Sequence, residues 1–547
     1  MPKRPPKPEP LGQGDSLPAL RFWLALALLL LAQAWAKLAL APGEPFRDEQ
    51  LRDWLGALST LQSGHFPAYG PAMQGGPPIP GGWYYFILAQ GARISQAPLA
   101  LAGFITALYT AAAGFLAWRL SGAFNRAAAL AVAALLSFHP LLIYQSAVIL
   151  NSHVAFPLLM VALGALMRQR ITFFYAALAG FCSVVAMHCH VVSVIALGAP
   201  LVWLLARWEG DEGWGFSWAG YALGLGLGGL GYIPWLLALG SQHGAPLSAV
   251  VQSRHRFHFD FAAQALKPIF FFCVQPGFEA SSFFGNRWSG FVGYFRFKTL
   301  SDAWALLATY GSFLAALWLA LLAWKGALSG PGSWRSRLLK PWGLALFRVI
   351  ALTLPVWFLL AGRFDVKFAG LLWAWSYLPL AAWLALCWPA WGREQRLLFA
   401  LAIGILCASG LSLHQRIFAQ RGADLENARY SYQTVDAAAL ALAQRQPKVA
   451  AVVFGAGNGP TFTDRAIYGL AKERYRWQGS PCAACPVSSF EEKAYGRPGD
   501  WVVADGGPVK GMPTVWIGPE TLSMQAQAAG GWRLLRFIDG MYLFANF

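Results

Sequence analysis

Long apolar runs separated by short polar segments fill most of the chain up to residue 412. An apolar run of about 18 residues or more can cross the hydrocarbon core of a membrane as a helix. This pattern predicts about eleven membrane-spanning helices. The expected ranges are 22–40, 98–117, 127–149, 154–167, 171–187, 191–206, 216–239, 303–324, 342–361, 369–391 and 397–412. The predicted fold class is therefore a polytopic α-helical membrane protein.

The composition excludes a soluble protein of this size. The chain has 547 residues, of which 57% are hydrophobic and 12% are charged. Soluble domains average about 25% charged residues. The formal net charge of +17 suits cytoplasmic loops and contact with anionic lipid head groups. No basic stretch is long or dense enough to predict nucleic-acid binding, so we expect membrane lipids and no nucleic acid among the partners.

The distribution of Lys and Arg predicts the orientation of the chain in the membrane. The N-terminus carries Lys3, Arg4 and Lys7, and every second short loop after it is also basic. The short loops between them, near residues 150 and 189, hold neither Lys nor Arg. Basic loops favour the cytoplasmic side of a membrane. We therefore expect a multi-pass protein of the bacterial inner membrane, with a cytoplasmic N-terminus and an extracytoplasmic C-terminus in the cell envelope.

This topology divides the chain into a transmembrane domain, 1–412, and an external C-terminal part, 413–547 (the tail). Residues 41–97 (the first loop) and the loop 241–302 are then also extracytoplasmic. In the tail, charge rises and the apolar runs shorten to strand length. These features predict a C-terminal extracytoplasmic, periplasmic α/β domain. Its expected strands are 449–454, 501–504, 514–517 and 532–537, and its expected helix is 434–445.

One pair of cysteines lies in the tail. Cys482 and Cys485 flank two alanines and are themselves flanked by prolines. In an oxidising compartment such a pair favours a local disulfide. A zinc site would need two further ligands, and the tail contains no histidine after His414. We therefore predict a structural disulfide.

Two adjacent carboxylates follow the first predicted span. Asp48 and Glu49 begin a segment in which apolar residues recur at helical spacing, at Leu51, Trp54, Leu55 and Leu58. This pattern predicts a short amphipathic helix. Acidic residues stabilise the first turn of a helix through its dipole. The pair is therefore either a structural feature of that turn or a catalytic group at the membrane surface.

Motifs further along the first loop resemble a known family. Ser63-Gly64-His65-Phe66-Pro67 is followed by Gly70-Pro71, by Gly75-Gly76-Pro77-Pro78, and by a helix that begins Gly81-Gly82-Trp83-Tyr84-Tyr85. This order resembles the polytopic GT-C superfamily of membrane glycosyltransferases, notably the ArnT-like and protein-mannosyltransferase-like bacterial family. The resemblance covers residues 1–210 best and the remaining layout loosely.

The resemblance implies an enzyme activity. Members of the family take a sugar from a polyprenyl-phosphate-linked donor and transfer it, with inversion, to an extracytoplasmic lipid, glycan or protein. An acidic residue of the first loop acts as the base, which carries over to Asp48 with Glu49 beside it. A carboxylate can take the proton of a weakly nucleophilic acceptor, and cations stabilise the departing phosphate. The sugar and the acceptor stay unidentified.

Several other residues are candidates for substrate binding. Basic side chains suit the carrier phosphate because their N–H groups bond phosphate oxygens. Asn151 stands where many relatives have a second acid, which puts metal dependence in doubt, although a divalent metal is possible. Helix capping and packing, or an interfacial position for the basic residues, are the structural alternatives. The substrate-binding candidates are His65, Tyr84, Asn151, His153, His188, Arg254, Arg256, Arg363 and Lys367.

Two other classes of function compete with the enzyme. A transporter or flippase of lipid-linked sugars would often show an internal repeat and charged residues within its spans. The sequence shows no convincing repeat, and its predicted spans are nearly free of acidic residues. A non-catalytic assembly scaffold would leave the Asp48–Glu49 pair unexplained. The sequence therefore favours the glycosyltransferase, with the flippase as the alternative.

Overall fold

The computed structural model describes the chain in parts. The described residues are 17–44, 46, 48–71, 80–167, 170–190, 193, 197, 215–241, 377, 381, 384–385, 387–421, 431–444, 451–454, 467, 469–471, 474–475, 514–519, 533–538 and 541–545. The predicted spans 303–324 and 342–361 lie outside these residues, as does nearly all of the span 191–206. Arg254, Arg256, Arg363, Lys367, Cys482 and Cys485 lie outside them as well.

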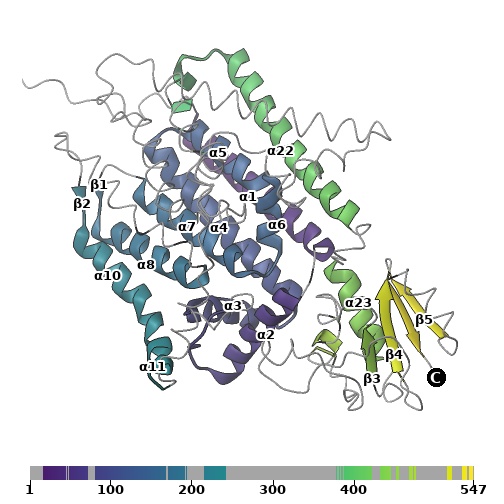
Figure 1. Cartoon of the computed structure of the whole chain (residues 1–547). Coiled ribbons are helices and arrows are strands. Elements are labelled where there is room, and N and C mark those ends of the chain that lie inside the picture. Colours follow the sequence, from purple (N-terminus) through teal and green to yellow (C-terminus); the bar gives the residue numbers. More distant parts are fainter. Residues whose placement is uncertain are drawn as a thin grey trace, which may run out of the picture.

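Apolar helices dominate the first part of the chain (Figure 1). Within the described residues, three helices are long and apolar enough to cross a membrane: Ala19–Gly43, Pro98–Ala123 and Trp218–Ala238. These contain α1 (Ala19–Leu40), α4 (Pro98–Ala123) and α10 (Trp218–Gly229), which continues through a short turn into α11 (Ile233–Ser241). The predicted membrane helical fold is confirmed, and the total of about eleven spans stays a prediction.

The outer surfaces of these helices are apolar. Leu28 and Trp35 of α1 are 68% and 74% exposed, and Leu237 of α11 is 71% exposed. A soluble protein rarely exposes so many large apolar side chains together. Such side chains can face lipid, and the backbone of a helix can lie in lipid as well because its polar groups are bonded to one another.

Close helix packing holds α8 (Phe173–Cys189) against α10. A Cβ atom at Gly180 would lie 2.6 Å from the carbonyl oxygen of Tyr221, and one at Gly224 would overlap the carbonyl oxygen of Ala177. Small residues let helix backbones approach in this way inside a membrane, where van der Waals contact replaces the hydrophobic effect. The same device joins α4 to α7 (Asn151–Leu166), where Gly164 faces Phe115.

The predicted single span 127–149 is wrong in one respect, because the structure divides it into two helices. Helix α5 (Arg126–Phe138) ends before His139, and α6 (Pro140–Ala147) begins at Pro140. The residue before a proline is driven out of the helical region, and His139 has the extended ψ angle of 129°. Pro140 then occupies the first turn of α6, where its missing N–H costs nothing.

Two helices of the first loop lie side by side. Helix α2 (Asp48–Ser63) confirms the predicted amphipathic helix, and α3 (Gly82–Ile94) follows it. Leu51 and Trp54 are buried, and the Trp54 indole donates a hydrogen bond of 2.7 Å to the carbonyl oxygen of Gln96. The segment after α2 returns to the start of α3, where Gly70 packs against Gly81. A Cβ atom on Gly70 would lie 2.6 Å from the Gly81 Cα atom.

The tail contains a helix and a sheet. Helix α22 (Arg393–Arg421) leads toward it, and α23 (Tyr432–Ala443) lies beside the sheet in Figure 1. The strands are β3 (Ala451–Phe454), β4 (Thr514–Pro519), β5 (Arg533–Ile538) and β6 (Met541–Ala545). They form a four-stranded sheet in the order β3-β4-β6-β5, in which only the β3–β4 pair is parallel.

The sheet agrees with most of the expected strands of the tail. β3, β4 and β5 coincide with the predictions at 449–454, 514–517 and 532–537, and α23 coincides with 434–445. The expected strand 501–504 lies outside the described residues. The sequence analysis missed β6, although Asp539-Gly540 between β5 and β6 is a dipeptide typical of tight hairpin turns. An independent domain on the outer side of the membrane stays a prediction.

Candidate functional site

The acidic pair lies directly after the first apolar helix. Helix α1 ends at Leu40, a short 3₁₀ turn covers Ala41–Gly43, and α2 begins at Asp48. Glu49 is half-buried in the first turn of α2, and the side chain of Asp48 lies outside the described part of the structure. Carboxylates are favourable at this end of a helix because it carries partial positive charge.

A buried carboxylate that the sequence analysis missed holds α2 in place. Asp53 has no exposed surface. Its Oδ1 atom lies 2.8 Å from the guanidinium of Arg52, and its Oδ2 atom accepts a 2.8 Å hydrogen bond from the hydroxyl of Tyr84 on α3. The Tyr85 hydroxyl lies 3.5 Å from Oδ1. The Asp53 cluster, formed by these four side chains, therefore ties the acidic helix to α3.

The charges of the Asp53 cluster influence one another. Burial raises the pKa of Asp53, while the charge and hydrogen bonds of Arg52 oppose that rise. The negative charge of Glu49 raises the Asp53 pKa further. Burial and the Asp53 charge together raise the pKa of Tyr84, which keeps its hydroxyl protonated as a donor. Because Asp53 and Tyr84 are both fully buried, their contact ties α2 to α3 inside the protein.

The predicted residues of the first loop have different environments. His65 is exposed in the segment after α2, where its backbone N–H lies 3.3 Å from the Ser63 hydroxyl. Tyr84 is buried, and its hydroxyl is occupied by Asp53. A role in substrate binding stays a prediction for both residues, and for Tyr84 it would have to act through α2.

Asn151 and His153 are bonded to nearby backbone. Asn151 begins α7, and its side-chain oxygen accepts a 2.9 Å hydrogen bond from the N–H of Ser152. His153 is buried, with its Nδ1 atom 2.9 Å from the carbonyl oxygen of Val148. The Asn151 bond favours the capping alternative, since unbonded N–H groups at a helix start need such partners. The His153 bond favours the packing alternative, because it joins the buried ring to the backbone before α7.

His188 lies beside the beginning of α3. A Cβ on Gly81 would be 2.7 Å from the His188 carbonyl oxygen, and the His188 ring centroid is 3.9 Å from that of Tyr232. The Trp83 indole donates a 2.9 Å bond to the carbonyl oxygen of Gly228 nearby. Neither His188 ring nitrogen has a hydrogen-bond partner within the part of the chain that the structure describes. The fold thus brings His188 to the first loop, and its role in substrate binding stays a prediction.

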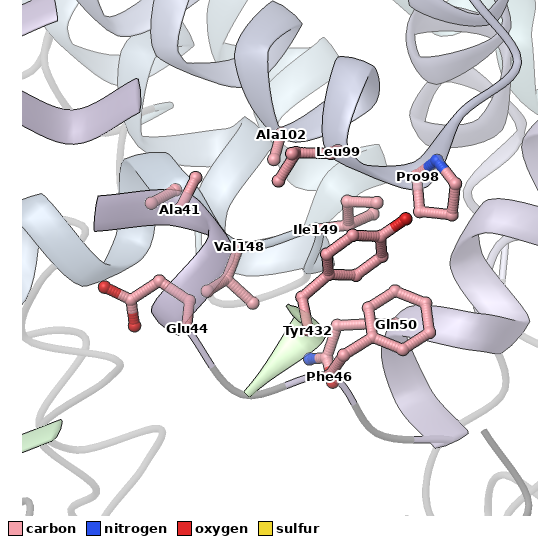
Figure 2. Close-up of a pocket in the computed structure, with 11 residues that line it drawn as sticks. Ala41, Glu44, Phe46, Gln50, Pro98, Leu99, Ala102, Val148, Ile149 and Tyr432 are labelled. Atoms are coloured by element: carbon pink, nitrogen blue, oxygen red, sulfur yellow. The ribbon is translucent and has the colours of Figure 1, made fainter. Parts of the chain in front are cut away.

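A pocket lies between the 3₁₀ turn after α1, the start of α2, α4, the end of α6 and the tail (Figure 2). About 250 Å³ of space without protein atoms lies in and around it, including open solvent. Its polar lining comes from Glu44, Gln50 and Tyr432, and its apolar lining from Ala41, Phe46, Pro98, Leu99, Ala102, Ala147, Val148 and Ile149. Glu44 and Tyr432 line this pocket and were not among the candidates of the sequence analysis, because they come together only through contacts between distant segments.

Metal-binding side chains do not gather at one point within the described residues. A divalent ion bound by protein needs several oxygen, nitrogen or sulfur ligands around one point. No group of three or more His, Cys, Asp or Glu side chains is placed to hold a metal within the described ranges.

Comparisons with known proteins find likeness only in structure. No protein-family model matches the chain, and no curated protein matches it in sequence. Among solved structures, it is similar to ArnT from Cupriavidus metallidurans bound to undecaprenyl phosphate, with 12% identity and a TM-score of 0.48 over 96% of this chain and 98% of that chain. The apo form of that protein is 13% identical, with a TM-score of 0.49 over 97% and 99% of the two chains.

Two other glycosyltransferases are also similar. The arabinofuranosyltransferase AftD from Mycobacteria is 14% identical, with a TM-score of 0.48 over 97% of this chain and 40% of that chain. The oligosaccharyltransferase AglB from Archaeoglobus fulgidus, in complex with an inhibitory peptide and a dolichol-phosphate, is 14% identical, with a TM-score of 0.38 over 82% and 63% of the two chains. The names of these proteins agree with the resemblance described in the sequence analysis, and the likeness in structure carries no further argument about this chain. At these scores the likeness says nothing about individual site residues.

Proposed function

We propose that the protein is an integral membrane glycosyltransferase that moves a sugar from a polyprenyl-phosphate-linked donor to an extracytoplasmic acceptor, with inversion. The carrying observation is the Asp53 cluster, in which a fully buried carboxylate bonds Tyr84 of α3 at 2.8 Å. It holds rigidly a helix that begins with Asp48-Glu49 directly after a membrane helix. Asp48 is the catalytic base in this proposal, and Glu49 assists it.

The chemistry needs a base and a stabilised leaving group. Asp48 removes the proton of the acceptor hydroxyl or amine, and the acceptor atom attacks C1 of the sugar. The bond between C1 and the phosphate oxygen breaks, and its electron pair leaves with the lipid phosphate. This single displacement inverts the configuration at C1. Arg254, Arg256, Arg363 and Lys367 are the proposed cations for the phosphate.

Rigid placement of the base supports this assignment. A catalytic group on a helix keeps its geometry better than one on a loop, provided that the helix itself is held by packing and buried hydrogen bonds. Leu51 is completely buried and Trp54 is 2% exposed on the packed face of α2. With the Asp53 cluster, these contacts leave the first turn of α2 little freedom to tilt.

The test is sugar transfer by purified variants. Asp48→Asn keeps the shape of the side chain and removes its basicity, so turnover is expected to fall by about 10²–10⁴-fold. Glu49→Gln is expected to lose less. Glu394→Gln, an exposed acid in the first turn of α22, is the matched control and keeps normal turnover. Near-normal turnover in both Asp48→Asn and Glu49→Gln would contradict the proposal.

A second candidate function is the flipping of lipid-linked sugars. One observation favours it: Lys37 of α1 is 1% exposed, with its Nζ atom 3.2 Å from the side-chain oxygen of Gln33 and 5.1 Å from the Tyr109 ring centroid. Ionisable residues inside membrane helices often mark transport pathways. Vesicle-reconstituted protein would then translocate a fluorescent lipid-linked sugar, and Lys37→Met would abolish this movement.

A further inference from the structure

The tail contacts the segment that carries the acidic pair. Glu44 begins this segment, and its Oε1 atom lies 2.6 Å from the Nε2 atom of His414 near the end of α22. Both side chains are almost completely buried, with 3% and 2% of their surface exposed. A carboxylate and an imidazole this close form a strong charge-assisted bond when the imidazole is protonated.

Tyr432, at the start of α23, holds the next part of the segment. Its backbone N–H donates a 2.7 Å hydrogen bond to the carbonyl oxygen of Glu44. Its ring meets the ring of Phe46 edge-on, with centroids 5.3 Å apart. Figure 2 shows Tyr432 among the side chains of the first loop, on one wall of the pocket. The tail therefore contacts both the Glu44 backbone and the Phe46 side chain just before α2.

A third contact reaches α2 itself. A Cβ atom on Gly469 would overlap the side chain of Leu51, so the backbone of the tail lies directly against it. Leu51 follows the acidic pair by one helical turn and has no exposed surface. Ile467 and Leu470, on either side of Gly469, are also fully buried.

The tail has its own bonds that keep these contacts in register. Asp436 accepts a 2.9 Å bond from Arg474 and another of 2.9 Å from the Tyr475 hydroxyl. Arg474 also donates to the hydroxyl of Tyr432. Arg474 and Tyr475 are therefore bonded to α23, although they are distant from it in sequence.

We propose that His414 and Tyr432 are positioning residues for the acidic pair, so that the tail completes the active site instead of forming a separate appendage. The inference rests on the proposed function of Asp48 and Glu49. Only a few residues separate Glu44 from Asp48, so a displacement at Glu44 moves the first turn of α2. Misplacement of a catalytic group by about 1 Å can lower the rate by about 10²-fold.

Kinetics of tail variants test the proposal. His414→Ala and Tyr432→Ala are expected to lower kcat for sugar transfer by up to about 10²-fold, with KM for the lipid donor unchanged. His414→Gln is expected to recover part of the loss, because its amide N–H can donate to Glu44. Gln433→Ala, at the exposed neighbour of Tyr432, is the control and keeps normal kcat.

Hydrogen exchange separates positioning from general instability and applies to any variant that can be purified. Loss of the His414 contact is expected to speed amide exchange in residues 48–51 at the start of α2 while leaving α3 unchanged. Normal kcat together with unchanged exchange in His414→Ala and Tyr432→Ala would overturn the inference. If those variants are normal and Asp48→Asn is inactive, only the positioning role fails. If Asp48→Asn and Glu49→Gln are both active, the proposed function fails.

Discussion

Removal of the Tyr84 hydroxyl tests whether the Asp53 cluster holds α2 in place. Tyr84→Phe deletes one oxygen and leaves the ring. The deleted oxygen is the 2.8 Å donor to Asp53 Oδ2, in a fully buried site. Tyr85→Phe is the matched control, because it removes the same atom from the neighbouring residue, whose hydroxyl lies 3.5 Å from Asp53 Oδ1.

The expected magnitudes differ between the two variants. Loss of a good hydrogen bond that leaves a buried acceptor without its donor costs about 1–3 kcal/mol, and more when the acceptor is charged. A contact at 3.5 Å is beyond the usual range for a strong hydrogen bond, so its loss is expected to cost under about 0.5 kcal/mol. Tyr84→Phe should therefore be clearly less stable than Tyr85→Phe.

Thermal melting of purified protein in detergent measures the difference, and a double-mutant cycle with Asp53→Asn identifies its origin. If Tyr84 acts through Asp53, then Tyr84→Phe has a smaller effect in the Asp53→Asn background than in the native one. Equal melting of Tyr84→Phe and Tyr85→Phe, or full additivity with Asp53→Asn, would refute this account of the cluster.

Further predictions concern pH, helix packing and the tail. Burial raises the pKa of Asp53 above its ordinary value of 3.8. The stability advantage of the native protein over Asp53→Asn is therefore complete below pH 3.8 and shrinks as the pH rises through the pKa of the folded state. Melting curves in which this advantage grows with pH would contradict the prediction. Gly224→Ala should destabilise by about 1–3 kcal/mol, whereas Gly226→Ala, with nothing within 4 Å, should not. Cys482 and Cys485 should resist alkylation until reduced.

The apolar pattern by itself determined the class of fold. Whether a segment can cross a membrane depends on its own length and polarity, so α1, α4 and α10 lie where the sequence places apolar runs. Helix α2 was likewise predictable, because Leu51 and Trp54 show the helical period without reference to any partner. The sequence analysis predicted one span across Pro140 and missed the break there, although the local effect of proline on the preceding residue signals it.

Only the tertiary structure decided which carboxylates of the first loop are buried. In the sequence, Asp53 is one more polar residue of an amphipathic helix, and nothing local distinguishes it from Glu49. Its burial depends on Tyr84, 31 positions away, and the Glu44–His414 bond joins residues 370 positions apart. Burial and ion pairing depend on which segments pack together in space. The local pattern of apolar residues does not specify such contacts between distant segments.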